Sequence, residues 1–310
     1  MKPLAVIGNV NVDLILGPAA PWPTPGTEII VDHDELRVGG SAGNSALAWT
    51  ALGVDFAIAA NVGSDEFGRW LREAFGVRAE KWSVRPEGTT LSVGITHPDG
   101  ERTFFTTRGH LPRFSLADVL AVLDGAQLAG GYALLCGAFL TADLTSDYSA
   151  LFDWADRHDI TLALDTGWPL DGWTAENCAA TRRWLGRCGC VLMNEVETTT
   201  LAGLSDPFEA ARSLKAQMRE GAIVVVKRGA DGAIGIDADG TLVVAAAPVV
   251  TVVDTIGAGD VFNAGFLAAL AEGQSLQACL DAGTRIASQA ISTLPRSYGG
   301  PLFTAEENPR

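Results

Sequence analysis

A glycine-rich segment near the end of the chain, residues 254–266, combines a carboxylate with the start of a helix. Gly257 and Gly259 allow backbone angles that leave several N–H groups unpaired, and the apolar run after them predicts a buried helix. A helix N-terminus attracts phosphate through its free N–H donors and the positive end of its dipole. A carboxylate beside bound phosphate is repelled by it, so the presence of Asp260 there indicates a chemical role. The role that we expect is removal of a proton from an attacking hydroxyl.

Two common nucleotide-binding motifs are absent from the chain. A Walker A loop requires Gly-Lys followed by Ser or Thr, and no Gly-Lys pair occurs. A dinucleotide fingerprint requires a third glycine three positions after Gly259, where Phe262 stands. The alternative to an anion site is a helix that is simply capped by Asp260 or Thr255. The rest of the chain has to decide between the two.

Two further motifs support a nucleotide-dependent enzyme. Residues 39–53 read as a glycine loop, a helix of small residues and a glycine stop, with Asn44 in the first turn of the helix. Asn194 and Glu197 follow an apolar strand at residues 190–193. Together with the first segment, these motifs resemble the signatures of the ribokinase (PfkB) family of carbohydrate kinases. Their order and separation fit that family over nearly the whole chain.

The resemblance implies ATP-dependent phosphorylation of a sugar or sugar-like hydroxyl by in-line transfer. Asp260 would accept the proton of the attacking hydroxyl as general base. The N–H groups of Gly257, Ala258 and Gly259 would stabilise the charge on the phosphoryl group during transfer.

The resemblance also implies two metal sites. Asn194 and Glu197 match the family's NxxE motif and would position Mg²⁺ through water, since this ion keeps much of its hydration shell. A monovalent cation such as K⁺ would lie beside the anion loop, bound by Asp254 and the carbonyl of Ile256.

The nucleotide is expected to contact a second loop. Lys227 ends an apolar strand at residues 223–226 and resembles the family's nucleotide-side loop, which makes it a candidate phosphate contact. The alternative for Lys227 is a solvated strand end. Gly229, Gly232 and Thr255 complete the predicted nucleotide site.

The sugar site is predicted around Asp13, just after the first strand, which resembles the family's sugar-binding aspartate. A carboxylate can accept hydrogen bonds from two neighbouring hydroxyls, which suits a vicinal diol. The alternative is a carboxylate that only stabilises a turn. The other predicted substrate contacts are Asn11, Gly39, Gly40, Asn44 and Arg108.

The substrate class stays open between charged and uncharged sugars. Residues 134–139 lack the carboxylate that ribokinases place against the sugar, which makes ribose less favoured, and residues 164–173 partly resemble fructokinase-like members. Arg102 and Arg108 flank a proposed lid strand and would suit a phosphosugar or sugar acid. An uncharged sugar or polyol needs neither arginine.

Two further alternatives are a nucleoside kinase of the same family and a catalytically silent sugar- or nucleotide-binding regulatory protein. Retention of Asp260 argues against the silent protein, because binding alone needs no base. A nucleobase would need aromatic side chains to stack against. The candidates are Trp22, Phe105 and Trp168.

The elements that carry these residues indicate an α/β fold. Short, continuously apolar runs alternate with helical patterns, as in parallel strands covered on both faces. We expect one ribokinase-like catalytic domain over residues 1–310, a three-layer α/β/α sandwich with a mostly parallel sheet, and ligands beyond the carboxyl ends of its strands.

Strand-like segments without intervening helices predict a small separate β-sheet inserted in this domain. They are residues 12–18, 27–38 and 89–107, the last containing a hairpin turn at residues 97–100. A small sheet cannot bury its faces alone and must close on something. The resemblance implies a lid over the sugar and a homodimer contact through it.

Composition excludes several other classes of partner. The formal net charge of −15 argues against nucleic acid and anionic membranes, which demand positive surfaces. The five cysteines lack metal-site spacing and indicate reduced packing residues. No secretion signal or long apolar span is evident, so we expect a cytoplasmic protein.

Overall fold

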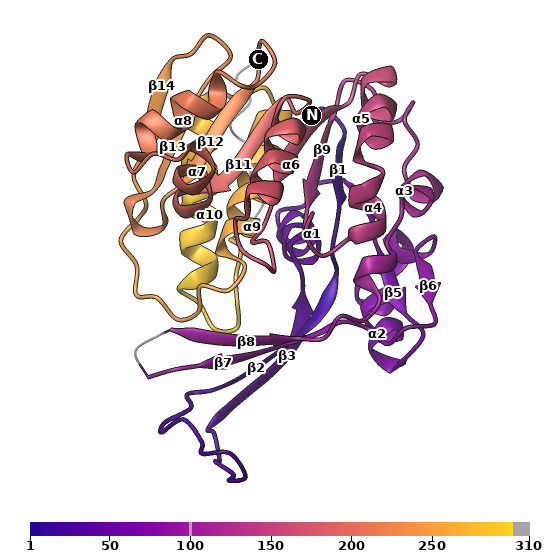
Figure 1. Ribbon diagram of the computed structural model, residues 1–310, viewed down its shortest axis with the longest axis vertical. Coiled ribbons are helices and arrows are strands. Elements are labelled where there is room, and N and C mark those ends of the chain that lie inside the picture. Colours follow the sequence, from indigo (N-terminus) through magenta and orange to yellow (C-terminus); the bar gives the residue numbers. More distant parts are fainter. Residues whose placement is uncertain (99–100, 300–310) are drawn as a thin grey trace.

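An eight-stranded sheet forms the middle layer of the computed structural model, which describes residues 1–98 and 101–299 (Figure 1). Its strand order is β14-β13-β12-β11-β10-β9-β1-β4, and only β13 and β14 run antiparallel to their neighbours. The strands are β1 (Leu4–Ile7), β4 (Ala57–Ala59), β9 (Tyr132–Cys136), β10 (Thr161–Asp165), β11 (Cys190–Asn194), β12 (Ile223–Lys227), β13 (Ala233–Ile236) and β14 (Leu242–Ala245).

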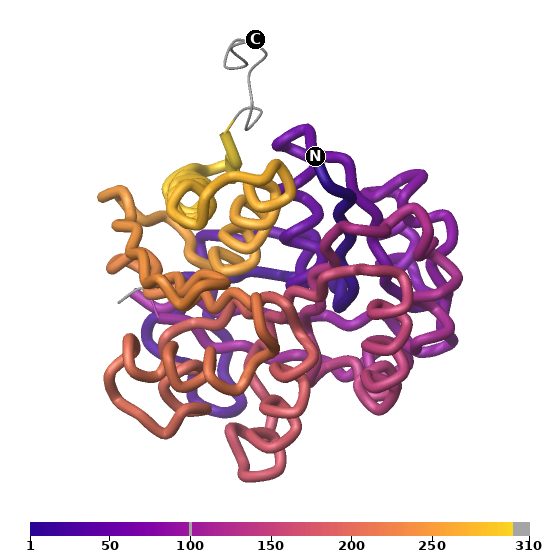
Figure 2. The backbone as a smooth tube through the Cα atoms, turned by 90° about the horizontal axis from the view of Figure 1, so that it is seen from above, coloured from indigo at the N-terminus to yellow at the C-terminus, as the bar shows by residue number. Residues whose placement is uncertain are grey.

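Helices cover both faces of this sheet, with the C-terminal helices on one side and those of the central part of the chain on the other (Figure 2). The first side holds α1 (Ser41–Ala51), α9 (Ala258–Ala271) and α10 (Leu276–Ile291), with α2 (Glu66–Phe75) beside them. The second side holds α3 (Leu116–Val122), α5 (Tyr148–Arg157), α6 (Ala175–Leu185), α7 (Glu195–Ala202) and α8 (Pro207–Lys215).

The continuous apolarity of the strands is explained by two separate cores. Val225 packs with α9 and α10, whereas its neighbour Val224 packs with α8 on the opposite face. Alternate residues of a central strand therefore serve different layers, whereas Val244 on the edge strand β14 is 45% exposed. The predicted three-layer α/β sandwich is confirmed. No helix of the described residues is long and apolar enough to cross a bilayer.

Short elements complete the described part of the chain. The strands β5 and β6 pair as a separate two-stranded sheet, and α4 precedes α5. These elements and three short 3₁₀ helices are β5 (Asn61–Gly63), β6 (Ser83–Arg85), α4 (Ala142–Ser146), η1 (Gly76–Ala79), η2 (Leu111–Arg113) and η3 (Gly229–Asp231).

The expected small sheet is present as a separate four-stranded layer, here called the lid, below the main sheet in Figure 1. Its order is β3-β2-β7-β8, formed by β2 (Asn11–Gly17), β3 (His33–Gly39), β7 (Leu91–Thr96) and β8 (Arg102–Thr106). Strand β3 begins only at His33, so residues 27–32 precede the sheet. Part of the turn expected at 97–100 lies outside the described residues.

The register of the lid strands separates its two faces. Successive residues of a strand point to opposite faces, and paired residues point to the same one. One row across the four strands is polar: Arg37, Asp13, Ser92 and Thr106. The neighbouring row is apolar: Leu36, Leu14, Val93 and Phe105. The polar face lies toward the main body, because Arg37 of the polar row binds Asp254, which precedes α9.

Candidate active site

The anion loop forms at the start of α9 as the glycines predict. Gly257 caps the helix in the left-handed conformation, with φ of 73°, which favours glycine. Ala258, Gly259 and Asp260 form the first helical turn. The N–H of Ala258 already donates to the carbonyl of Thr255 at 3.1 Å. The first-turn amides have no partner within the helix ladder, so the loop presents donors to an anion.

Helix α1 holds the carboxylate of Asp260. Nδ2 of Asn44 donates to Oδ2 of Asp260 at 2.8 Å, and the hydroxyl of Ser45 donates to its backbone carbonyl at 3.0 Å. One turn further, the indole of Trp49 donates to the carbonyl of Ala264 at 2.8 Å. Burial raises the pKa of Asp260 to about 6, and the charge of Asp165 adds to the rise. A carboxylate tuned toward neutral pH is suited to general base catalysis.

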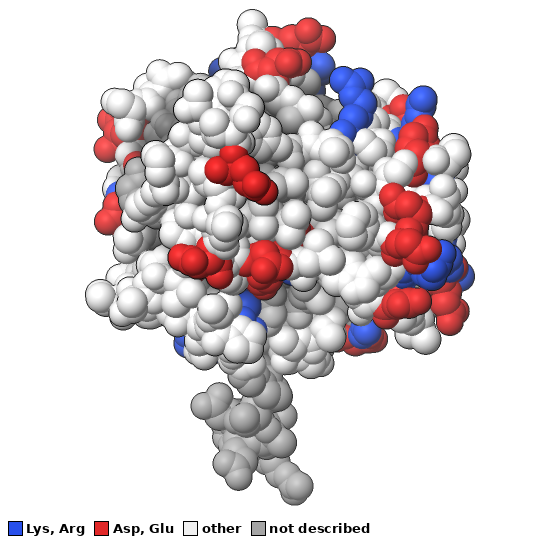
Figure 3. Space-filling model, turned by 90° about the horizontal axis from the view of Figure 1, so that it is seen from below, with Lys and Arg blue, Asp and Glu red and all other residues white. Residues whose placement is uncertain are grey.

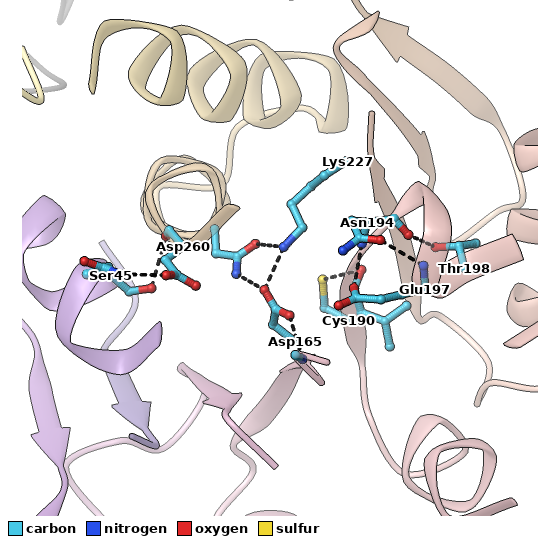
Figure 4. Close-up of polar contacts among 12 residues, drawn as sticks. Ser45, Asp165, Cys190, Asn194, Glu197, Thr198, Lys227 and Asp260 are labelled. Carbon is cyan, nitrogen blue, oxygen red and sulfur yellow. Dashed lines mark hydrogen bonds and ion pairs between the residues drawn. The ribbon is translucent and has the colours of Figure 1, made fainter. Parts of the chain in front are cut away.

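A buried ion pair lies beside this carboxylate, between the ends of β10 and β12 (Figure 4). Nζ of Lys227 lies 2.6 Å from Oδ2 of Asp165 and donates to Oδ1 of Asn263 at 3.2 Å. Nδ2 of Asn263 donates to the same Asp165 oxygen at 2.5 Å. A Cβ at Gly259 would lie 3.3 Å from Nζ, so the ammonium reaches the anion loop.

The ion pair keeps Lys227 charged. Burial alone would lower the pKa of Lys227, but the carboxylates of Asp165 and Glu197 raise it above its usual value. Lys227 is therefore not the solvated strand end that the sequence left open. Asp165 and Asn263 were not predicted as site residues. Asn263 stands three positions after Asp260, on the same helical face, and that spacing is the signal that could have found it.

Asn194 and Glu197 form a capping box at the start of α7 (Figure 4). The N–H of Glu197 donates to Oδ1 of Asn194, and the N–H of Asn194 donates to Oε2 of Glu197, both at 2.8 Å. Burial and the charge of Asp165 raise the pKa of Glu197 to about 7. The motif thus has a structural role. It engages the side-chain oxygen of Asn194 and one of the two carboxylate oxygens of Glu197.

A cavity of about 670 Å³ extends from the anion loop toward α10. All six predicted nucleotide residues line it together with Gly257, Ala258, Gly259 and Asp260; the six are Asn194, Glu197, Lys227, Gly229, Gly232 and Thr255. Its remaining wall is mostly apolar and includes Pro248, Val249, Val252 and Ile291. Sequence reasoning missed this wall because residues 247–252 have neither helical nor strand periodicity.

A second cavity, of about 320 Å³, lies against the polar face of the lid. Asn11, Asp13, Gly40 and Asn44 line it, and Asp260 lines both cavities. Nδ2 of Asn11 donates to Oδ1 of Asp13 at 2.8 Å. Burial raises the pKa of Asp13 to about 6, although the nearby charge of Arg37 lowers it.

Gly39 and Arg108 do not line this second cavity. Gly39 supports it from behind, because a Cβ there would lie 2.2 Å from the carboxylate of Asp13. The side chain of Arg108 is exposed, and its carbonyl accepts a hydrogen bond from Thr90. Arg102 instead donates to the hydroxyl of Thr255.

Several residues of the second cavity were not predicted. Ser92, Phe104 and Thr106 come from the lid, and Phe139, Leu140, Thr166 and Leu170 form the opposite wall. Of the aromatic residues considered for base stacking, Trp168 lines the cavity, whereas Phe105 belongs to the apolar face of the lid. The sequence signal for the lid residues was the spacing of Phe104 and Thr106, which are two positions apart on one strand and therefore point to the same face.

Asp254, expected to bind a monovalent cation, is engaged by two arginines. Its Oδ2 accepts from Nη1 of Arg37 at 2.7 Å and from Nη2 of Arg296 at 2.8 Å. Its Oδ1 accepts from the N–H of Ile256 at 2.9 Å. Although burial opposes it, this amide and the two guanidinium groups hold the pKa of Asp254 below its usual value.

Comparison with known proteins agrees with this geometry. Residues 1–295 match the family model described as pfkB family carbohydrate kinase. The 1-phosphofructokinase of Escherichia coli (strain K12) is 28% identical, with 85% of this chain and 83% of that protein covered. The ribokinase of Haemophilus influenzae is 24% identical, with 99% and 97% covered.

The fold is that of ribokinase. The structure of Arabidopsis thaliana ribokinase complexed with ribose and ATP superposes with a TM-score of 0.74 at 22% identity, covering 96% of this chain and 94% of that chain. The anion loop with its adjoining carboxylate, the lid and the family model lead to one assignment. The chain belongs to the pfkB family of carbohydrate kinases, enzymes that transfer a phosphoryl group from ATP to a carbohydrate.

Proposed function

We propose that this kinase transfers the γ-phosphoryl group of ATP in line to a hydroxyl of an uncharged sugar or polyol, with Asp260 as general base. The observation that carries the proposal is the position of Asp260. Its carboxylate lines both cavities and stands in the first turn of α9, beside the anion loop. A hydroxyl bound in the second cavity would give its proton to Asp260 as the phosphoryl group arrives from the first.

The phosphates are stabilised by donors from two directions in this proposal. The amides of the anion loop face them from the start of α9, and Lys227 approaches from the end of β12. Both sets of donors are fixed before the substrate binds, which is the arrangement that stabilises developing charge most effectively. Lys227 would exchange part of its contact with Asp165 for a contact with phosphate.

Mg²⁺ fits this site as a companion of the nucleotide. The capping box leaves Asn194 and Glu197 on the wall of the nucleotide cavity, where they can hold water molecules of a hydrated ion. Within residues 1–98 and 101–299, no group of three or more acidic, His or Cys side chains is arranged to hold a metal alone. The phosphates themselves would complete the site, and the ion would neutralise their charge.

The charge of the second cavity favours an uncharged acceptor. Among the described residues that line it, Asp13 and Asp260 are the charged side chains, and both are acidic. A phosphate or carboxylate on the acceptor would be repelled by them. The acceptor named for the 1-phosphofructokinase relative carries a phosphate, so we expect the two enzymes to differ in substrate. The carboxylate of Asp13 would accept from a vicinal diol.

A nucleoside is the second candidate, favoured by one observation. Phe104 and Trp168 are large aromatic side chains that line the second cavity and remain about half exposed, at 47% and 55%. Exposed aromatic side chains in a cavity can stack against a planar base. An apolar face of a sugar ring would use the same side chains, so a substrate screen has to separate the two.

The apolar face of the lid supports a homodimer. Leu36 and Phe105 are 46% and 56% exposed, and Leu14 and Val93 lie between them in the same row. Viewed from below, the side on which the lid lies, much of the surface carries no charge (Figure 3). We propose that two lids pack face to face in a dimer. Because ATP is the donor, we also propose a cytoplasmic location.

The test is a screen of purified protein with Mg²⁺ and ATP against sugars, polyols, nucleosides and phosphosugars. Asp260→Asn keeps the size of the side chain and should lower turnover by about 10²- to 10⁴-fold, while acceptor binding is retained. The matched control is Asp281→Asn, an exposed aspartate on α10. Near-normal turnover of Asp260→Asn would remove Asp260 as the base, and preferred phosphorylation of phosphosugars would contradict the uncharged acceptor.

A further inference from the structure

Three arginines from distant parts of the chain converge on the residues that precede the anion loop. Arg37 comes from β3 and Arg102 from β8, both in the lid, whereas Arg296 follows α10. Arg37 and Arg296 bind the carboxylate of Asp254 at 2.7 and 2.8 Å, and Arg102 donates to the hydroxyl of Thr255. The lid and the segment after α10 therefore both hold the residues that precede the anion loop.

Arg296 also touches the loop itself. A Cβ at Gly257, the residue that caps α9, would lie 3.3 Å from Nη1 of Arg296. The side chains of Arg37 and Arg296 are only 15% and 13% exposed, so water and salt screen their charge weakly. Guanidinium groups stay protonated at any physiological pH. Arg37 is also paired with Glu35 at 3.4 Å, so the charges of this cluster balance, and it is Arg296 that places a positive charge directly against the phosphoryl-binding loop at Gly257.

The ion pair between Arg37 and Asp254 is not a purely structural salt bridge. Nε and Nη2 of Arg37 are buried without a hydrogen-bond partner in the described part of the chain. Burying unpaired donors costs stability, and a neutral side chain would avoid this cost. The arrangement is better explained by the charge that it delivers than by the stability that it contributes.

A monovalent cation does not fit at Asp254. Oδ2 already accepts from two guanidinium groups, and Oδ1 accepts from the N–H of Ile256. An ion placed there would lie against two positive charges and would have to displace one of them. The residues present therefore disagree with the K⁺ site that the family resemblance implies.

We propose that Arg296, supported by Arg37, is a positioning residue that supplies a built-in positive charge to the anion loop in place of a monovalent cation. The inference rests on the proposed function, because it takes the loop as the phosphoryl-binding site. The guanidinium of Arg296 fixes Asp254 and the turn through Ile256, and so fixes the amide donors that follow at Gly257.

The first readout is nucleotide binding, which needs no knowledge of the acceptor. Binding of a non-hydrolysable ATP analogue with Mg²⁺ is measured by calorimetry in potassium chloride and in tetramethylammonium chloride of equal ionic strength. The wild-type affinity should be the same in both salts. Arg296→Ala should bind about 10-fold more weakly in tetramethylammonium, and K⁺ or methylguanidinium should restore part of the loss.

The matched control is Arg285→Ala, an exposed arginine on α10, which should behave as wild type in every salt. Arg296→Lys keeps a positive charge and should bind more tightly than Arg296→Ala, and thermal unfolding of each variant checks its folding. Once an acceptor is found, kcat/KM for ATP should follow the same order.

Two results would overturn the inference. One is clear tightening of the wild-type complex by K⁺, which would show that an ion still binds. The other is unchanged affinity of folded Arg296→Ala without K⁺, which would show that the charge has no effect on the loop. Failure of the proposed function has a different signature, namely salt-independent nucleotide binding with no acceptor phosphorylated.

Discussion

Loss of Lys227 should destabilise the protein more than its position at a strand end suggests. The side chains of Lys227 and Asp165 are 11% and 9% exposed, and Nζ of the lysine lies 2.6 Å from Oδ2 of the aspartate. Removing one partner of a buried ion pair leaves an uncompensated charge and typically costs about 3–5 kcal/mol. Here the stranded carboxylate would also face Glu197 and Asp260, so Lys227→Met should reach the upper part of this range.

In thermal unfolding, this loss corresponds to a Tm lowered by roughly 5–8 °C for a chain of 310 residues. The double variant Asp165→Asn/Lys227→Met removes both charges together. Replacing a buried pair by neutral residues is often close to neutral, so the double variant should regain most of the Tm. Its turnover with ATP should stay low, because the phosphate contact is gone. Stability and activity thus separate within one series.

The matched control is Arg187→Met, which removes a partly exposed arginine that contacts Asp153 and Asp156 at 2.8 and 2.7 Å. Exposed pairs contribute about 0–1 kcal/mol, so this variant should unfold within a few degrees of wild type. An unchanged Tm for Lys227→Met would refute the argument from burial. Recovery of turnover in the double variant would refute the phosphate contact.

Two further predictions concern the base and the lid. Because burial raises the pKa of Asp260 to about 6 and the base must be deprotonated, kcat/KM should fall as the pH decreases through about 6; a flat profile between about pH 5 and 8 would contradict this. Light scattering after size exclusion should show a dimer for wild type and a monomer for Leu36→Asp/Phe105→Asp, and a double variant that stays dimeric would place the interface elsewhere.

The sequence predicted most of the features that depend on local pattern. Gly257 is needed because the chain turns there with a positive φ. A glycine directly before an apolar helical pattern is the sequence sign of such a turn. The main sheet was predictable because continuous apolar runs occur in strands with helices on both faces. The lid strands were predictable in number, but residues 27–32 carry strand-like composition without joining the sheet.

Contacts between residues far apart in the chain could not be predicted from the sequence, because they depend on tertiary packing. Arg37 is separated from Asp254 by 217 positions, and Asp165 from Asn263 by 98. Arg37 lies between the exposed Leu36 and the buried Val38, and a strand of mostly polar residues carries no local sign that one arginine will be largely buried. Arg108 shows the reverse case: its position after a lid strand suggested a substrate contact, yet its side chain is exposed.

These distant contacts explain how an acidic chain can bind a polyanion. The net charge of −15 acts mainly through the surface, where it is screened within about 8 Å at physiological salt. Inside the site, Lys227 is held by Asp165, and Arg37 and Arg296 are held by Asp254. In our proposal each cation is held close to its place before ATP binds, and Lys227 only has to exchange part of its contact with Asp165 for a contact with phosphate. We propose that these carboxylates, whose own charge opposes ATP binding, serve to hold the cations in place for it.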